Sequence, residues 1–366
     1  MAQYTENSAS KPRILTGDTP TGRLHLGHYV GSLENRVQLQ DQFDCYFIIA
    51  NVHAFTTRAQ QPSDIRQSVL DIAADYLAAG IDPGKSTIFV QSEIPAIAEL
   101  TFFFSMLVPF SRLMRNPTIK DEIRDKNLGD SYSFGFLLYP IGQIADILAF
   151  RPALVPVGED QLAHLELTRE TARRFDQMYC GVDPQTPDEQ YVQAGGLFPI
   201  IEPRLGRVRR LVGLGGPGPH GQLLKMSKSL NNAIYLSDDP DTIRKKVMSM
   251  YTDPNRKKAT DPGTTENNPL WIFHETFNPD TVWVREAMGK YRAGAIGDVE
   301  CKKKLVEVLV ALIDPMRQRR LIYEKDPAQL LAVLREGTAR ANVVAEETLR
   351  LAKIALKQDY RPRTLL

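Results

Sequence analysis

The stretch Cys45-Tyr46-Phe47-Ile48-Ile49-Ala50 decides the fold class, because it is a continuous apolar run bounded by polar residues. Strands that are buried on both faces of a parallel sheet show such runs. Residues 13–16 (Arg-Ile-Leu-Thr) and 87–91 (Thr-Ile-Phe-Val-Gln) predict two further strands. Residues 153–157 predict another, although Pro156 is unfavourable in a central strand.

Helical patterns follow these strands. Residues 24–40 have helical spacing, and so do residues 64–79, for which we expect Ser63 as the N-cap and Gly80 as the C-cap. Strands that alternate with helices of this length form βαβ units. The sequence therefore predicts an α/β domain with a parallel sheet.

The pattern of the remaining sequence indicates where the predicted domains begin and end. The region of about 95–150 has a mostly helical pattern and is expected to be an insertion in the sheet domain. Residues 195–221 are rich in glycine, proline and arginine and predict loops with short strands. Helical periodicity dominates after Ser237. We expect a catalytic domain at 1–236 and a helical region at 237–366, whose last helix can pack back on the first domain.

Composition excludes several classes of protein. The chain has 366 residues, 43% of them hydrophobic, and a net charge of +1, which suits a soluble enzyme and not a protein that coats nucleic acid. Its cysteines, Cys45, Cys180 and Cys301, are too far apart in sequence to suggest a zinc ribbon. No apolar run approaches the roughly 20 residues of a membrane span, and no signal peptide is evident, so the cytoplasm is the expected location.

The first candidate motif is Pro20-Thr21-Gly22-Arg23-Leu24-His25-Leu26-Gly27-His28, between a predicted strand and a predicted helix. Open α/β sheets bind ligands at this point, and the N–H groups of a helix start suit a phosphate. His25 and His28 lie three residues apart, so they share a helix face and can donate to a triphosphate. A metal-binding pair or two incidental surface residues are the alternatives.

The second motif is Lys225-Met226-Ser227-Lys228-Ser229, in a loop after the glycine-rich stretch. Two lysines on a flexible loop can close over a triphosphate and neutralise charge that develops in a transition state. Alone, two lysines three apart are common and mean little.

A third group, Tyr139, Gln143 and Asp146, has the spacing i, i+4, i+7 of one helix face. A buried carboxylate at the end of an aromatic slot can accept a hydrogen bond from an indole N–H or a phenol O–H. The alternative is a helix with a polar outer face.

The first two motifs together resemble the signatures of class I aminoacyl-tRNA synthetases. The segment from Val155 to Gln161, with His164-Leu165-Glu166-Leu167-Thr168-Arg169 after it, is similar to the tryptophanyl-tRNA synthetases. So are Gln91-Ser92-Glu93-Ile94-Pro95 and Gly80-Ile81-Asp82-Pro83. The resemblance runs from about residue 12 to about residue 355. It implies a Rossmann-like catalytic domain with a helical insertion, followed by an α-helical domain.

The resemblance also implies roles. Asp160 would bind ribose, Gln161 would face the amino group of the substrate, and Met226 would meet adenine through its backbone. Lys120 would reach the phosphates. The residues implied for catalysis are Lys225, Lys228, Lys120, His25 and His28. Those implied for ATP are Thr16, Asp18, Thr21, Gly27, His28, Gly158, Asp160, Met226 and Ser227. Those implied for the amino acid are Tyr139, Gln143, Asp146, Gln161 and His53, of which Asp146 reads the indole nitrogen and His53 lies beside the ring.

The implied ligands are ATP, Mg²⁺ carried by ATP with no metal site of the protein's own, L-tryptophan and tRNA(Trp), without a membrane. A homodimer is also implied, and the apolar stretch Thr101–Phe110 is the expected interface, with ordinary core as the alternative. Many bacterial relatives have Thr and Asn in place of His25 and His28, and Met in place of Gln143, so the chain resembles a divergent second type. A tyrosyl-tRNA synthetase, a nucleotidyltransferase that uses no tRNA and a non-catalytic regulator remain as alternatives.

Basic residues after Ser237 are expected to contact tRNA near the anticodon, with a solvated surface as the alternative. They include Lys245, Lys246, Lys257 and Lys258.

Overall fold

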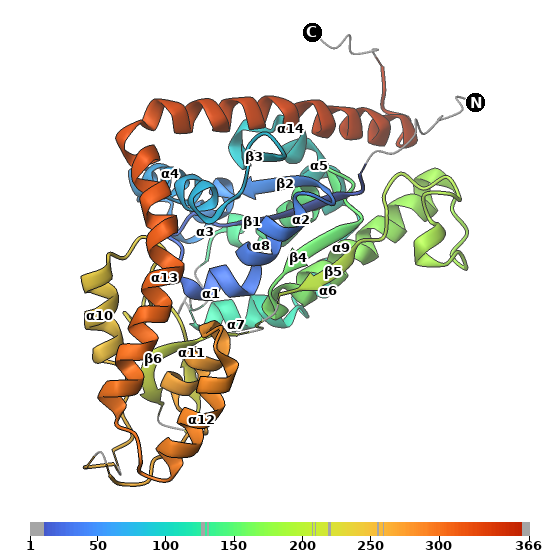
Figure 1. Cartoon of the computed structure of the whole chain (residues 1–366). Coiled ribbons are helices and arrows are strands. Elements are labelled where there is room, and N and C mark those ends of the chain that lie inside the picture. Colours follow the sequence, from blue (N-terminus) through green and yellow to red (C-terminus); the bar gives the residue numbers. More distant parts are fainter. Residues whose placement is uncertain are drawn as a thin grey trace.

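A five-stranded parallel sheet with the strand order β3-β2-β1-β4-β5 forms the centre of the molecule (Figure 1). The structure is a computed structural model. It describes residues 11–125, 129, 132–206, 208, 210–218, 221–254, 256–258 and 260–360, apart from the side chains of Asp125 and Asp160. The strands are β1 (Arg13–Asp18), β2 (Asp44–Ile49), β3 (Ser86–Val90), β4 (Leu154–Val157) and β5 (Glu202–Leu205).

Strand β2 is buried on both faces, as its apolar run predicts. Cys45, Phe47 and Ile49 belong to one hydrophobic cluster, whereas Tyr46 and Ile48 belong to a second one. The first cluster joins the sheet to α4 (Pro62–Ala79) and α13 (Asp298–Lys325), and the second joins it to α5 (Pro95–Ser105), α8 (Phe134–Leu148) and α9 (Leu162–Phe175). The predicted α/β class with a parallel sheet is therefore confirmed.

Helix α4 begins one residue before the predicted cap. Gln61 is the N-cap and Pro62 the first residue, so the prediction of Ser63 as the cap was wrong. Proline suits this position because its missing N–H would have no partner there. Gly80 ends the helix in the left-handed region with φ 113°, as predicted.

The helix that was predicted from residue 24 starts later, at α1 (Leu26–His28), and continues through a π-helical turn (Tyr29–Leu33) into α2 (Glu34–Leu39). Residues 24 and 25 are not helical because the segment 24–26 pairs with residues 234–236. The N–H of Leu26 donates to the Ile234 carbonyl at 2.9 Å, and the N–H of Leu236 donates to the Leu24 carbonyl at 3.0 Å.

Helices fill most of the region between β3 and β4, as the pattern predicts. Besides α5 and α8 they are α6 (Phe110–Leu113) and α7 (Pro117–Asp125). Strand β4 includes Pro156, which is tolerated although β4 lies between β1 and β5. A short antiparallel pair, β6 (Val212–Pro217) and β7 (Leu223–Lys225), follows β5.

The last part of the chain is helical and returns to the sheet (Figure 1). Helix α13 packs against α4, and α14 (Pro327–Ala355) covers the edge strand β3 and contacts α5. Between β7 and α13 lie α10 (Pro240–Met248), α11 (Pro269–Phe277) and α12 (Thr281–Arg292). Among the described residues, no helix is both long enough and apolar enough to cross a membrane.

Helix α14 approaches β3 so closely that only glycine fits at position 337. A Cβ atom there would lie 1.9 Å from the Ile88 carbonyl oxygen. We expect Gly337→Ala to push α14 off the sheet edge and to lower the stability by about 1–3 kcal/mol, as overpacking does. Thermal unfolding measures this. The control is Gly289→Ala in α12, where a Cβ meets no atom within 4 Å, and where alanine should add roughly 0.5–1 kcal/mol. An equal increase in stability in both variants would contradict the close packing of α14 against β3.

Candidate active site

The residues predicted for substrate binding gather at the carboxyl edge of the sheet. All four strand pairings are parallel, so the ends of the strands meet at one edge. Asp18 is the last residue of β1, His53 lies in α3 (Asn51–Arg58) directly after β2, and Gly158 follows β4. The chain leaves β1 toward β2 and later returns on its other side as β4. This reversal of strand order is the place where open α/β sheets bind ligands.

His25 and His28 cap the first signature helix with their rings. His25 Nδ1 accepts the Gly27 N–H at 3.1 Å, and His28 Nδ1 accepts the His25 N–H at 3.2 Å. Burial is the largest cause that lowers the pKa of His25, to about 2, and that of His28, to about 4. Both rings are therefore neutral at pH 7. Because each Nδ1 is an acceptor, each Nε2 carries the hydrogen and is a donor.

This geometry disfavours the interpretation of the two histidines as a metal-binding pair. Both Nδ1 atoms already accept backbone hydrogen bonds. In the part of the chain that the structure describes, no group of three or more His, Cys, Asp or Glu side chains has an arrangement that could hold a metal ion. The two Nε2–H groups are instead suited to anionic oxygen atoms.

The second signature loop lies against the first. Lys228 Nζ donates to the Gly22 carbonyl at 2.8 Å and to Thr21 Oγ1 at 3.1 Å. Burial lowers the pKa of Lys228 to about 8, against the opposing effect of the nearby carboxylates of Asp18 and Asp75. Two motifs that are distant in the sequence thus form one basic corner.

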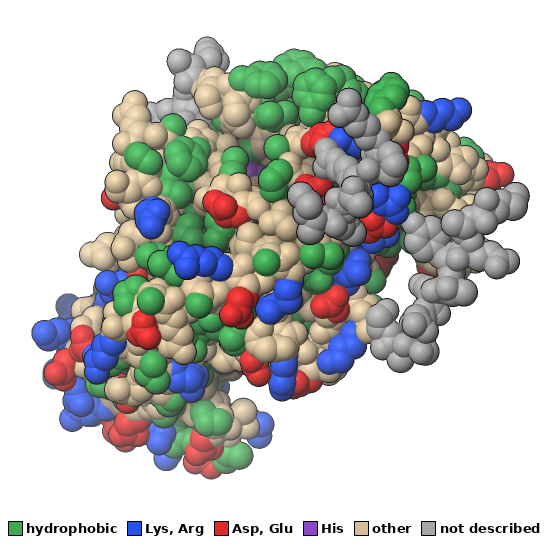
Figure 2. Space-filling view, turned by 90° about the horizontal axis from the view of Figure 1, so that it is seen from above, with side chains coloured by type: hydrophobic (Ala, Val, Ile, Leu, Met, Phe, Trp, Pro, Cys, Tyr) green, Lys and Arg blue, Asp and Glu red, His purple; other side chains and the backbone are tan. Residues whose placement is uncertain are grey.

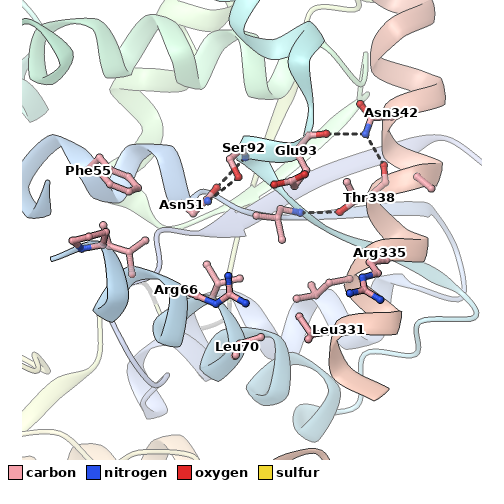
Figure 3. A pocket seen from close by; sticks show the side chains of 16 residues that line it. Asn51, Phe55, Arg66, Leu70, Ser92, Glu93, Leu331, Arg335, Thr338 and Asn342 are labelled. Carbon is pink, nitrogen blue, oxygen red and sulfur yellow. Dashed lines mark hydrogen bonds between the residues drawn. The ribbon is translucent and has the colours of Figure 1, made fainter. Parts of the chain in front are cut away.

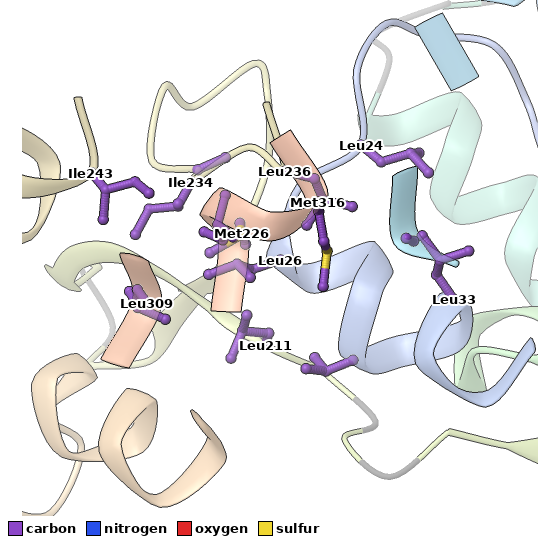
Figure 4. Packing of buried hydrophobic residues seen from close by; sticks show 14 of the residues in the cluster. Leu24, Leu26, Leu33, Leu211, Met226, Ile234, Leu236, Ile243, Leu309 and Met316 are labelled. Carbon is purple, nitrogen blue, oxygen red and sulfur yellow. The ribbon is translucent and has the colours of Figure 1, made fainter. Parts of the chain in front are cut away.

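Met226 anchors this loop in the protein core. Its side chain is buried and packs in the same cluster as Leu26, Leu211 and Ile234, as Figure 4 shows. The Met226 N–H donates to the Leu211 carbonyl at 3.0 Å. The flanking Lys225 is exposed. The loop therefore combines a fixed methionine with lysines on either side that point out of the core.

A buried carboxylate lies at the opposite end of the candidate site. Gln91 Nε2 donates to both oxygens of Asp146, at 2.8 and 2.9 Å. Gln91 Oε1 accepts the N–H groups of Val52 and His53 at the start of α3, at 2.9 and 3.3 Å. These two bonds fix the orientation of the amide, so its NH₂ group must face Asp146.

Among the residues that the structure describes, Asp146 has no cationic partner. His53 Nε2 lies 3.4 Å from Asp146 Oδ2, but burial, with His164 nearby, lowers the pKa of His53 to about 4 and leaves it neutral. Burial also raises the pKa of Asp146 to about 7, although the Gln91 hydrogen bond acts against this. An ionised carboxylate in such a place needs further donors, which a ligand can supply.

Helix α8 places the other predicted residues along the same side. The rings of Tyr139 and His53 lie edge to face with 6.0 Å between their centroids. Gln143 Nε2 donates to Gln161 Oε1 at 3.2 Å. Gly142 makes room for the His53 ring, since a Cβ atom there would lie 3.2 Å from His53 Nε2. The alternative that this face of α8 is an ordinary polar surface does not fit these contacts.

Some predicted residues already have structural partners. Thr16 Oγ1 donates to the Pro156 carbonyl and ties β1 to β4. Asp18 accepts from Arg36 Nη1 at 2.7 Å and from the Tyr76 hydroxyl at 2.6 Å. Burial alone would raise the pKa of Asp18, but Arg36 and the other nearby positive and hydrogen-bonding groups hold it at about 2.

Three other predicted residues are placed less directly. Lys120 is exposed on α7. The Ser227 N–H donates to Asn232 Oδ1 at 2.8 Å. The side chain of Asp160 lies outside the described part of the structure.

Sequence reasoning missed the residues that hold these groups in place. Gln91 fixes Asp146, Arg36 holds Asp18, and Asn232 brackets the second signature loop through Ser227 and the Lys225 carbonyl. His164 lies 3.3 Å from the Tyr139 hydroxyl and 3.4 Å from the Asn116 side chain. Gln91 had a signal, since it ends a predicted strand. The spacing of the other three gives none.

A separate groove of about 760 Å³ lies between α4 and α14 (Figure 3). Asn51 Nδ2 donates to Ser92 Oγ across its margin at 2.9 Å. Arg66 and Arg335 line it from the two helices. None of the residues that were predicted for ATP or for the amino acid lines this groove.

Comparisons with known proteins show the family to which the chain belongs. Residues 7–314 match the family model described as tRNA synthetases class I (W and Y). A tryptophan–tRNA ligase of Clostridium longisporum is 46% identical over 357 residues, which cover 96% of this chain and 98% of the relative. The tryptophan–tRNA ligase of Streptococcus pneumoniae serotype 4 is also 46% identical, with 96% and 99% covered.

A solved structure is similar over nearly the whole chain. The tryptophanyl-tRNA synthetase of Campylobacter jejuni in complex with ADP and tryptophan has a TM-score of 0.78 and 30% identity, and the match covers 94% of this chain and 99% of that one. Sequence identity, coverage and fold lead to the same assignment. The chain belongs to the class I tRNA synthetases for tryptophan and tyrosine, and within them to the tryptophan–tRNA ligases.

Proposed function

We propose that this enzyme activates L-tryptophan with ATP and transfers it to the 3′ end of tRNA(Trp). One observation carries the choice of amino acid: a buried carboxylate, Asp146, whose protein donors are neutral and whose site is bordered by the rings of His53 and Tyr139. The names of the relatives support the same substrate, because they are tryptophan–tRNA ligases and a structure that contains tryptophan.

The amino acid is read at both of its ends. An indole N–H that donates to Asp146 gives the carboxylate the donor that it lacks. A substrate without this N–H leaves a buried acceptor unpaired, which costs more than a missing methylene group. The amide oxygens of Gln143 and Gln161 and the hydroxyl of Tyr139 can accept from the α-ammonium group. Tyrosine remains the competing ligand, because a phenol O–H can donate to the same carboxylate.

The phosphates bind at the other end of the site. His25 and His28 present neutral Nε2–H donors, and Lys225 and Lys228 supply positive charge. Mg²⁺ bound to the ATP phosphates would add charge stabilisation as a Lewis acid. The residues beside the phosphates are donors and cations, so they fit phosphate oxygens and leave the metal to be carried by ATP.

Catalysis needs no nucleophile from the protein. The tryptophan carboxylate attacks the α-phosphorus of ATP, a new C–O–P linkage forms, and pyrophosphate leaves. The ribose hydroxyl of the terminal tRNA adenosine then attacks the adenylate carbonyl and releases AMP. The protein contributes by positioning the reactants and by stabilising the charge on the leaving pyrophosphate.

The helical region after Ser237 is the proposed tRNA-binding part of the molecule. The cytoplasm is the proposed location of the enzyme. Lys245, Lys257 and Lys258 are exposed in this helical region. Lys246 is less suited, because its ammonium group donates to Asp238 at 2.6 Å. A nucleotidyltransferase that uses no tRNA would not need this region. Transfer of labelled tryptophan to tRNA separates the two functions.

The two signature lysines should act on the rate of adenylation. We expect Lys225→Ala and Lys228→Ala each to remove about 2–4 kcal/mol of transition-state stabilisation, as loss of a preorganised charged donor does. Tryptophan binding should hardly change. Pre-steady-state adenylate formation measures the first effect, and equilibrium tryptophan binding the second. Lys303→Ala, at an exposed lysine of α13, is the control. Adenylate formation at the wild-type rate in both variants would refute this role.

Asp146 should decide which amino acid is activated. With all twenty amino acids tested in turn, we expect pyrophosphate exchange to depend on tryptophan alone. Asp146→Asn keeps the shape of the side chain but weakens the hydrogen bond to the indole by roughly 1.5–3 kcal/mol, because the acceptor loses its charge. The KM for tryptophan should rise and that for ATP should not. Asp121→Asn, at an exposed carboxylate of α7, is the control. If pyrophosphate exchange depends on tyrosine instead, tyrosine and not tryptophan is the substrate.

A homodimer is the proposed assembly. Part of the stretch Thr101–Phe110 is core, since Phe104 is buried, but Phe102, Met106 and Phe110 are 65–66% exposed and Phe134 on α8 is 76% exposed. Exposed aromatic residues of this kind suit a self-complementary interface. Figure 2 shows how hydrophobic side chains gather in the upper part of the face that it presents, whereas charged side chains crowd the lower part.

Sedimentation at micromolar concentration should therefore give a dimer. We expect Phe102→Asp to give a folded monomer, because a buried unpaired carboxylate opposes association. Val343→Asp, at an exposed hydrophobic position of α14, is the control and should leave the dimer intact. A wild-type monomer, or equal loss of the dimer in both variants, would exclude this interface.

A further inference from the structure

The segment Leu24–Leu26, which lies within the first signature and leads into helix α1, is held by hydrogen bonds from two directions. On one side it pairs with Ile234 and Leu236, which follow the second signature loop. On the other side the Leu24 N–H donates to Asp75 Oδ2 at 2.7 Å. The residue after Leu24 is His25, the N-cap whose ring points a donor at the proposed phosphate site. The position of the Leu24 backbone therefore sets the position of that cap.

Asp75 is fully buried on α4, and its other oxygen is held by Arg320 of α13. Arg320 is itself 2% exposed, and each of its three nitrogen atoms donates a further hydrogen bond. Nη1 donates to the Asp71 carbonyl at 2.9 Å, Nη2 to Asp71 Oδ1 at 2.8 Å and Nε to Glu324 Oε1 at 2.8 Å. A continuous chain of charged hydrogen bonds thus runs from α13 through α4 to the backbone in front of His25.

Helix α13 is also linked to the segment Leu24–Leu26 through the hydrophobic core. Met316, one turn before Arg320, packs in the hydrophobic cluster with Leu24, Leu26 and Leu236, as Figure 4 shows. Helix α13 begins at Asp298, within the helical region that follows the sheet domain, and also packs on α10. A displacement of α13 would therefore act on Leu24 through the shared hydrophobic cluster and through the ion pair between Arg320 and Asp75.

We infer that Asp75 and Arg320 are positioning residues for adenylate formation: they fix Leu24 and thereby aim the His25 donor. This inference rests on the proposed function. Stability alone explains the pair poorly, because a buried ion pair is often no more stable than apolar residues of similar volume. The two helices already have another bond, from Arg319 Nε to the Ala78 carbonyl at 2.7 Å, which does not reach the signature.

The experiment compares two double variants in which no buried charge is left unpaired. Asp75→Asn with Arg320→Gln keeps an acceptor for the Leu24 N–H. Asp75→Leu with Arg320→Met packs the same space but removes the acceptor. Arg319→Met is the matched control, since it breaks the bond between the two helices without touching Asp75. Melting temperature, the KM values for ATP and tryptophan, kcat for pyrophosphate exchange, and hydrogen–deuterium exchange of the peptide 22–28 are measured for each.

We expect the apolar pair to melt near the wild-type temperature and to lose roughly 10- to 100-fold in kcat/KM for ATP, as misplaced catalytic groups do. Its KM for tryptophan should stay the same, and its 22–28 peptide should exchange faster. The polar pair should retain most of the activity, and Arg319→Met all of it. Should the apolar pair fail to fold, Asp75→Leu alone decides, because Arg320 keeps its ion pairs with Asp71 and Glu324 while the Leu24 N–H loses its acceptor. Faster exchange at 22–28 and a raised KM for ATP are then the expected result.

Wild-type ATP kinetics and unchanged exchange at 22–28 in a folded apolar pair, or in Asp75→Leu, would overturn the inference. So would equal losses in the two double variants or in Arg319→Met, because these would be losses of stability alone. The proposed function fails separately, if the wild type shows no pyrophosphate exchange that depends on an amino acid. The exchange of the 22–28 peptide needs no catalysis and tests the positioning of Leu24 in either case.

Discussion

The amide of Gln91 is the constraint on which the amino-acid end of the site depends. Its oxygen is taken by two backbone N–H groups at the start of α3, so its NH₂ group can only face Asp146. This joins the ends of β2 and β3 to α8 at one point. It also gives the buried carboxylate two hydrogen bonds without a counter-charge, and a carboxylate in that condition gains most from one more donor. The chemistry of the proposed ligand thus follows from how three elements meet.

The phosphate end is built on the same principle, with charges reversed. The Nδ1 atoms of His25 and His28 accept hydrogen bonds from the backbone, so their Nε2–H groups remain available as donors to the site. Burial keeps both rings neutral, so they can donate without adding charge to a corner that already holds Lys228. The two signatures lie together because Leu24–Leu26 pairs with residues 234–236, which follow the second signature loop. The paired residues pack in one hydrophobic cluster with Met316 of α13.

The sequence predicted the features that depend on residues close together in the chain. The strands predicted at 45–50 and 87–91 and the C-cap at Gly80 depend on neighbouring residues. The structure has β2 and β3 one residue earlier than predicted and Gly80 as the C-cap of α4. The start of the first signature helix was placed two residues too early, because a pairing with residues 234–236 overrides the helical pattern. The partners of the site residues also escaped prediction. Gln91 lies 55 positions from Asp146, and Arg320 lies 245 positions from Asp75, and no periodicity reports such contacts.

The central claim is that an ionised Asp146 receives the indole N–H, and tryptophan-binding calorimetry in buffers of different ionisation enthalpy tests it most directly. Burial raises the pKa of Asp146 to about 7, so the free enzyme carries a proton there at lower pH. Binding that requires the ionised form must release this proton, and affinity must rise with pH. The account predicts release that approaches about one proton per tryptophan near pH 6, falls toward zero above pH 8 and is lost in Asp146→Asn. Proton uptake, or release that is unchanged in Asp146→Asn, would contradict it.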